Sequence, residues 1–297
     1  MSTPLIAGEE TAESVGALAP PGKGQRKPAT GLLVAGLCLI GIVVVASVIA
    51  LFVLPNPNQQ DLLNTLQPPS ADHLFGTDDL GRDVLSRTLA GTWIDLPFGL
   101  FVTALGVFLG VIVGSTAGYI GGRFERVVMR ITDAVVAFPF LVFILAIIAV
   151  IGPGIVGLVV ALVSIGWALY ARVSRAEMLV LRETQFIQAA QTLGFSSSRV
   201  LFRHAVPNLL RPIAVYSCSD VVFNILAIAG LSFLGLGVRP PTPEWGAIID
   251  SGQAYVLSAW WISALPGLVV VFVGLGFVLV GDALGERLGV RREAVAE

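Results

Sequence analysis

Long runs without a charged residue divide this chain. Residues 31–54 form the first run, residues 96–122 the second and residues 134–171 the third. A helix needs about 20 apolar residues to cross a bilayer core of about 30 Å, so each of the first two runs predicts one transmembrane helix. The third is too long for one crossing. Gly152-Pro153-Gly154 lies near its middle, and because proline lacks a helix donor and glycine favours turns, we expect two spans there, about 134–151 and 155–171, joined by a hairpin.

Two further runs complete the pattern. Residues 212–238 are interrupted only by Asp220, and residues 251–281 carry no charge, with a membrane part at about 262–281. The sequence therefore predicts an all-α integral membrane protein with about six transmembrane helices. Composition agrees, since 55% of the 297 residues are hydrophobic and 13% are charged, about half the charge of a soluble domain. We expect a transmembrane domain over 31–285, a flexible tail over 1–30 and a short tail over 286–297.

The placement of lysine and arginine predicts the orientation. With the N-terminus inside, the four inner segments hold three, three, six and three basic residues, which is fifteen of the eighteen in the chain. Cytoplasmic segments of membrane proteins collect Lys and Arg. Both termini are therefore expected to be cytoplasmic. The tail over 1–30 carries acidic residues before its basic ones, which is not the pattern of a cleaved signal peptide.

Three segments outside the spans are long. The outer segment 55–95 predicts a short interfacial helix at 84–89. The outer segment 231–261 holds three prolines at 240–243 and cannot be one regular helix, so we expect it to dip toward the membrane or to shield the outer mouth. The inner loop, about 172–211, is much longer than a connection between two helices requires.

The inner loop has the pattern of a helix-turn-helix elbow. Residues 184–193 predict a short amphipathic helix that Thr184 can cap and that Gly194 can end in the left-handed conformation. The serines at 196–198 can then cap a second helical segment, 199–205, which Pro207 would stop. Ala189 and Ala190 have small side chains that leave the helix backbone accessible to a partner. This shape fits a cleft of another protein, and the alternative is a plain connector.

Four glycines in the second run recur every fourth residue: Gly106, Gly110, Gly114 and Gly118. Residues at this spacing share one helix face, and small side chains there let another helix approach closely. The main interpretation is a packing surface. The alternative is a surface that also slides during transport.

Asp220 is the one charged residue inside a predicted span. A carboxylate at mid-bilayer costs about 3 kcal/mol on insertion scales, so it predicts a functional or a paired site. Ser217 and Asn224 lie three residues before and four residues after it, which places all three on one polar stripe. The stripe either lines a translocation pathway or forms a hydrogen-bond network between helices.

Residues for catalysis or metal binding are scarce. The two cysteines lie in separate apolar runs, and His73 and His204 are the only histidines, so we expect no disulfide framework, no metal site and no catalytic residue. The net charge of −2 gives no support for a nucleic-acid partner. No G-x-x-x-x-G-K-[ST] sequence occurs, so the chain has no phosphate-binding loop of its own.

Three motifs carry a resemblance to a known family. Gln188-Ala189-Ala190-x-x-x-Gly194, followed by Pro207, resembles the EAA loop of binding-protein-dependent ABC importer permeases. The motif's Glu is Gln188 here, and its Ile-x-Leu-Pro is His-Ala-Val-Pro at 204–207. Residues 73–87 and 231–246 are similar to segments of the dipeptide, oligopeptide and nickel permeases of the second-subunit type. Relatives often carry an acid where Ile228 stands in this chain. The likeness runs from about 31 to 290.

This resemblance implies a type I ABC importer permease fold in the inner membrane of a prokaryote. It implies that the inner loop couples to separate P-loop ATPase subunits, one or two in number, which bind the ATP and Mg. It also implies a second permease subunit and an extracytoplasmic substrate-binding protein. Short peptides are the expected substrate, with nickel or another small solute as the alternative. A stand-alone secondary transporter or channel would need its own ion site, and a membrane enzyme would need reactive groups that the sequence does not offer.

Overall fold

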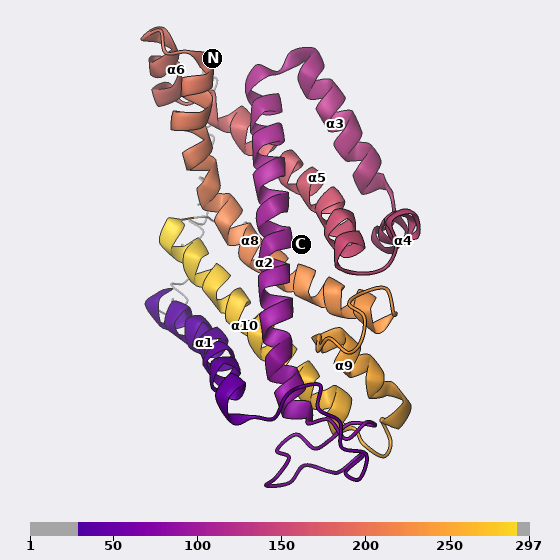
Figure 1. The fold of residues 1–297 in the computed structure, drawn as a ribbon. Helices are drawn as coiled ribbons and strands as arrows, with labels where there is room; N and C mark the ends of the chain where they lie inside the picture. Colours follow the sequence, from indigo (N-terminus) through magenta and orange to yellow (C-terminus); the bar gives the residue numbers. More distant parts are fainter. Residues whose placement is uncertain (1–28, 290–297) are drawn as a thin grey trace, which may run out of the picture.

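A computed structural model describes residues 29–289 of the chain. The long helices are α1 (Ala29–Val53), α2 (Val84–Ile120), α3 (Gly122–Ala137), α4 (Phe140–Ile151), α5 (Ile155–Leu181), α8 (Val206–Phe233) and α10 (Trp261–Leu288). Short helices complete the described part: α6 (Gln185–Thr192), α7 (Ser197–Arg199), the π-helical turn η1 (Val200–Ala205), α9 (Trp245–Ser251) and the turn η2 (Gln253–Tyr255). In Figure 1, α6 lies at one end of the bundle, whereas α9 and the loop before α2 lie at the opposite end.

The prediction of about six spans is confirmed, with one of them broken. Five helices among residues 29–289 are long and apolar enough to cross a membrane, and α3 with α4, bent by 96° at their break, makes a sixth when the pair is counted as one span. The span predicted at about 134–151 is not one continuous helix, because α3 ends at Ala137 and α4 begins at Phe140. Phe138 precedes Pro139 and has an extended backbone (ψ 139°), because the ring of a proline disfavours the helical conformation of the residue before it. The hairpin at Gly152–Gly154 is confirmed.

The predicted interfacial helix at 84–89 is not a separate element. It forms the first turns of α2, a helix of 37 residues that continues through Pro97 to Ile120. Asp83 caps the start of the helix, because its carboxylate accepts a hydrogen bond from the Ser86 amide (2.7 Å). That bond satisfies one of the free N–H groups of the first turn. No residue between 84 and 96 interrupts the helix, so the outer segment joins the span directly.

The glycine face of α2 packs directly against α5. The backbone carbonyl of Ala171 lies so close to Gly114 that an added Cβ atom would come within 2.1 Å of its oxygen. At Gly110 the same atom would come within 2.3 Å of Tyr170 Cβ, and Gly118 faces Arg175 and Met178. The four glycines therefore form a helix–helix contact surface, hereafter the glycine seam (residues 106, 110, 114 and 118).

Helices α1, α10 and α8 form the other side of the bundle, with α10 packed between α1 and α8. Arg287 near the end of α10 donates a hydrogen bond to the Thr30 hydroxyl near the start of α1 (3.2 Å). These two helix ends therefore lie on the same side, as the predicted topology requires. The tails predicted at 1–30 and 286–297 fall largely outside the described residues and stay predictions.

The outer segments fold onto the ends of the spans. Trp245 at the start of α9 is fully buried, and its indole N–H donates to the Thr88 carbonyl of α2 (2.8 Å). The Trp245 amide donates to the Asp95 carboxylate (3.0 Å), also on α2. The sequence left open whether the segment 231–261 dips toward the membrane or shields the outer mouth. In the structure, α9 from this segment packs against α2.

Replacing Trp245 with alanine is expected to destabilise this outer cover. The change removes a fully buried indole and its hydrogen bond to Thr88, and truncating a buried tryptophan costs about 3–5 kcal/mol. We expect a lower thermal unfolding midpoint for the purified protein and faster proteolysis of residues 234–260. Trp260→Ala is the matched control, because Trp260 is about half exposed. Equal loss of stability in both variants would contradict the prediction.

Candidate functional site

The inner loop forms a compact elbow, defined here as residues 184–205, at the end of the molecule that carries α6 (Figure 1). Its first limb is α6, close to the predicted helix at 184–193. Thr184 occupies the position before the helix, but its hydroxyl donates to the Leu181 carbonyl (2.5 Å) and caps nothing in α6. The prediction of a Thr184 cap is therefore wrong, because the last turn of α5 offers the hydroxyl a nearer acceptor.

Gly194 ends α6 as predicted. Its φ is +78°, in the left-handed region that residues with a Cβ atom rarely adopt. The Gly194 amide donates to the Gln191 carbonyl (2.9 Å), and the Phe195 amide donates to the Ala190 carbonyl (3.2 Å). These two bonds define a Schellman motif. The glycine thus fixes the angle at which the chain leaves α6.

The two faces of α6 differ sharply. Ile187 and Ala190 face inward and are buried, with Ile187 fully so. Gln188 and Ala189 are exposed, together with Phe186 (47%) and Leu193 (74%). Large apolar side chains left exposed next to a bare alanine backbone form a surface that fits a protein partner. The Gln188 side chain donates to the Glu183 carbonyl (3.2 Å).

The second limb of the elbow runs into the membrane without a stop. The turn η1 follows α7 and continues directly into α8, where Pro207 occupies the first turn. The prediction that Pro207 stops a helix is wrong. A proline in the first turn removes no bond that the helix needs, and here the wider π-helical turn precedes it. Pro207 is exposed and marks the start of α8.

Aromatic contacts pack the residue after Gly194 on the second limb. The Phe195 and His204 rings stack with their centroids 5.8 Å apart, and the Arg199 guanidinium lies 5.5 Å from the centre of the Phe195 ring. All three residues follow the turn at Gly194, and the two limbs meet in an apolar cluster that includes Ile187 and Ala190 of α6 and Val200 and Leu201 of η1. The two limbs of the elbow are therefore packed against each other as one structural unit.

Several contacts connect the elbow to the spans. Gln191 donates a hydrogen bond to the Tyr119 hydroxyl at the end of α2 (3.2 Å), and Arg182, which lies just before the elbow at the end of α5, donates to the Gly118 carbonyl (3.1 Å). Ile187 also belongs to a buried apolar cluster that includes Tyr170 and Met178 of α5. A movement of α6 would therefore be transmitted to α2 and α5.

The polar stripe on α8 makes hydrogen bonds to two neighbouring helices. The Tyr170 hydroxyl of α5 donates to the Asp220 carboxylate (3.0 Å), and the Asn224 amide donates to the same carboxylate oxygen (3.1 Å) and to the Thr103 hydroxyl of α2 (2.8 Å). The Tyr170 hydroxyl also lies within hydrogen-bond distance of the Ser217 hydroxyl (3.3 Å). Ser217, Asp220 and Asn224 thus meet α2 and α5, and the hydrogen-bond network that the sequence left open is present.

One side of this network borders a groove of about 800 Å³ between α2, α8 and α10. Thr103 and Ser217 line the groove, and its other walls are almost entirely apolar. Asn224 is buried, whereas Ser217 and Asp220 are partly exposed.

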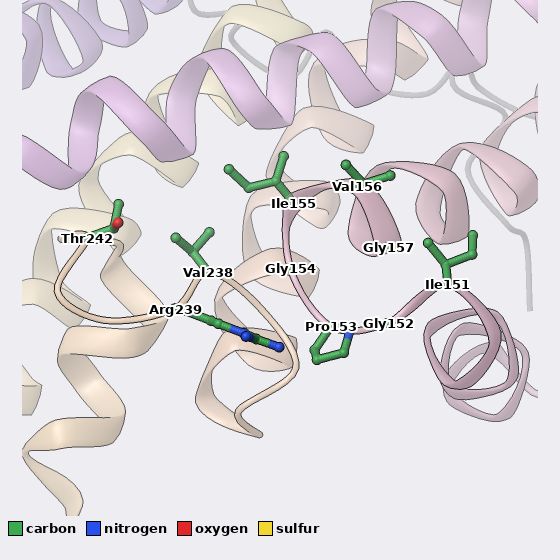
Figure 2. Close-up of a pocket in the computed structure, with 10 residues that line it drawn as sticks. All are labelled: Ile151, Gly152, Pro153, Gly154, Ile155, Val156, Gly157, Val238, Arg239 and Thr242. Atoms are coloured by element: carbon green, nitrogen blue, oxygen red, sulfur yellow. The ribbon is translucent and has the colours of Figure 1, made fainter.

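A smaller pocket of about 410 Å³ lies where the α4–α5 hairpin meets the loop after α8. Figure 2 shows the hairpin residues from Ile151 to Gly157 facing Val238, Arg239 and Thr242, with the Arg239 side chain extended toward Pro153. The Gly154 amide donates to the Leu236 carbonyl (3.2 Å). The hairpin and the outer segment are therefore in contact at this pocket.

Comparison with known proteins identifies the family. The family model described as "Binding-protein-dependent transport system inner membrane component" matches residues 106–292, which include the elbow and both helices that flank it. The chain belongs to this family. It is an ABC importer permease, a multi-pass protein of the inner membrane.

Named relatives of the permease cover most of its length. A Brucella suis protein named for peptide transport as a permease is 40% identical over 257 residues, 86% of each chain. The dipeptide transport system permease protein DppC of Alkalihalophilus pseudofirmus is 34% identical over 85% of each chain. The glutathione transport system permease protein GsiD of Shigella dysenteriae is 38% identical over 86% of this chain and 85% of the relative.

Sequence reasoning missed two features of the permease. It did not find Tyr170 and Thr103 as the partners of the Asp220 stripe, because hydrogen-bond partners on other helices leave no periodic signal. It also missed helix α3 as an amphipathic element. The signal was available there, since basic and apolar residues between 122 and 133 each recur at a spacing of three and four residues, which is the period of a helix.

Proposed function

We propose that this permease forms half of a peptide translocation pathway and that its elbow docks on an ATPase subunit. The observation that carries the docking proposal is the elbow itself. Its first helix ends in a glycine-dependent Schellman motif and exposes Phe186, Ala189 and Leu193. Gln188, Ala190, Gly194 and Pro207 complete the coupling residues, of which Ala190 packs inward and supports the exposed face.

The proposed complex contains a second, similar permease, one or two P-loop ATPase subunits and an extracytoplasmic binding protein. The permease itself holds no nucleotide, and the ATPase subunits bind ATP and Mg. Closure of the ATPase subunits would move α6, and the contacts of Gln191 with Tyr119 and of Arg182 with Gly118 would pass that movement to the spans. Short peptides are the proposed substrate, supported by relatives named for dipeptide and glutathione transport.

Purification of the complex tests this proposal. The full chain is expressed at its native level, extracted in a mild detergent and analysed by mass spectrometry, and the recovered complex is placed in liposomes with labelled dipeptides. We expect P-loop ATPases and a second permease to be recovered, and uptake to require ATP and the binding protein. A chain that is recovered alone and moves solute without ATP would overturn the proposal in favour of a secondary transporter or channel.

We further propose that Ser217, Asp220 and Asn224 border the pathway. The support is their position at the junction of α2, α5 and α8, where Ser217 also lines the groove of about 800 Å³. A carboxylate at this depth would offer a peptide amino group a counter-charge. The competing role is packing, in which the same hydrogen bonds hold the three helices together.

Asp220→Asn distinguishes these two roles. Asparagine keeps the size of the side chain and an acceptor for the Tyr170 hydroxyl but removes the charge. If the stripe borders the pathway, uptake should fall while the amount of assembled complex stays within about a factor of two of wild type. Uptake rate and the yield of complex from size-exclusion chromatography are measured on the same preparation. A matched loss of complex would assign the stripe to packing.

A further inference from the structure

Helix α3 presents three parallel stripes, each built from residues spaced i, i+3 and i+7. Successive residues on a helix are about 100° apart, so three stripes offset by one residue face three directions. The stripe that packs on α5 contains an acidic residue, the second stripe is apolar and exposed, and the third is basic and exposed. The inward stripe consists of Glu125, Val128 and Thr132. The apolar stripe consists of Phe124, Val127 and Ile131, and the basic stripe consists of Arg123, Arg126 and Arg130.

The inward stripe fixes α3 on α5. Val128 and Thr132 are buried, and the Arg175 guanidinium donates to the Glu125 carboxylate (2.6 Å). One turn beyond, Arg172 pairs with Asp133 (2.7 Å). Both acidic side chains of α3 are therefore already paired with arginines of α5.

The basic stripe has no carboxylate of its own. Arg123, Arg126 and Arg130 are all exposed and form no ion pair within residues 29–289. The one bond in which this stripe's side chains take part runs from Arg126 to the Gly122 carbonyl (3.3 Å), on the same helix. The stripe thus carries three positive charges that the described chain does not neutralise.

The apolar stripe continues into the membrane part of the permease. Phe124, Val127 and Ile131 are about half exposed, and the exposed surface runs on through Phe138 to Leu141 of α4. The ion pair between Arg172 and Asp133 is itself exposed, with 46% of the Arg172 side chain and 62% of the Asp133 side chain accessible to solvent. An exposed ion pair belongs in water or among headgroups, so the part of α3 that carries this pair lies at the level of the headgroups.

We propose that α3 binds anionic phospholipids of the cytoplasmic leaflet. The phosphate groups lie against Arg123, Arg126 and Arg130, and the upper part of an acyl chain packs on the neighbouring apolar stripe. A guanidinium group suits this role because it holds its charge and donates two parallel hydrogen bonds to a phosphate. Apolar and basic stripes side by side are the pattern of a helix at an anionic membrane surface.

Photolabelling with two lipid probes tests the proposal. The full-length permease is placed in phosphatidylcholine nanodiscs that contain a small fraction of either phosphatidylglycerol or phosphatidylcholine with a diazirine in the acyl chain. After irradiation, the label on residues 122–137 is measured by peptide mapping. We expect the anionic probe to label α3 about fivefold more than the neutral probe, the factor for one basic side chain near an anionic headgroup. The preference should shrink in 1 M salt, where charges are screened within about 3 Å.

Three variants sharpen the result. In R123Q/R126Q/R130Q the preference should fall to about one, whereas the charge-preserving R123K/R126K/R130K should keep most of it. The control R199Q/R203Q/R211Q removes the same charge from the elbow and the start of α8 and should leave the labelling ratio on α3 unchanged. Equal labelling by both probes in the wild-type protein would overturn the proposal. So would crosslinking of α3 to another protein chain, in a purified complex, in place of lipid.

Discussion

Gly194→Val is expected to reduce peptide uptake per ATP hydrolysed by about tenfold while the permease remains in the membrane. Gly194 has a φ of +78° and ends α6 through a Schellman motif. A residue with a Cβ atom pays about 1–2 kcal/mol in this conformation, and a β-branched residue is among the least tolerant. Since 1.4 kcal/mol is a factor of ten in a population, the docking-competent elbow becomes the minor form. The measurement is uptake and ATP hydrolysis in proteoliposomes of the assembled complex.

The environment of Gly194 makes this a test of conformation and not of crowding. An added Cβ atom at Gly194 meets no atom within 4 Å, so the strain arises from the backbone angle alone. Gly194→Asn should retain most of the coupling, because asparagine tolerates the left-handed region. Gly41→Val is the second control, since Gly41 lies within α1 and also faces open space. Unchanged coupling in Gly194→Val would show that the elbow angle does not matter for transport.

The parts of this permease that the sequence predicted are those set by local rules. The spans follow from runs of apolar residues, the hairpin follows from Gly152 to Gly154, and the end of α6 follows from one glycine. Each of these features is decided by residues that are neighbours in the chain. The charge at Asp220 likewise predicted a polar site inside the membrane, but it did not predict the hydrogen-bond partners of Asp220 on other helices.

The errors share a different cause. Thr184 was expected to cap α6 and Pro207 to stop a helix, but the choice of partner or path depended on the adjoining helix in each case. The predicted span over 134–151 took no account of Pro139, which breaks the helix at Phe138. Where a residue is compatible with two local structures, packing against neighbouring helices decides which one it adopts. The spacing of apolar residues along the chain does not reveal that packing.

Gly114→Val is expected to destabilise the permease severely, because it places a side chain inside the glycine seam. The new Cβ atom would lie 2.1 Å from the Ala171 carbonyl oxygen, a backbone atom that cannot rotate away. Overpacking of this kind typically costs about 1–3 kcal/mol, and occasionally more. At about 2–4 °C per kcal/mol for a protein of roughly this size, the corresponding fall in the thermal unfolding midpoint is roughly 2–12 °C. The measurement is thermal unfolding of the purified protein together with its yield in the membrane fraction.

Gly106→Ala separates a static seam from one that slides during transport. At Gly106 the added Cβ atom would lie 3.6 Å from the nearest backbone atom, at Gly166, which is ordinary van der Waals contact. The variant should therefore fold with normal stability, unlike Gly114→Val. If α2 moves along α5 during the cycle, the extra methyl group would obstruct that movement, and uptake would fall although the complex assembles. Normal uptake by a normally stable Gly106→Ala protein would assign the seam to packing, because a contact that never shifts has no step for the methyl group to block.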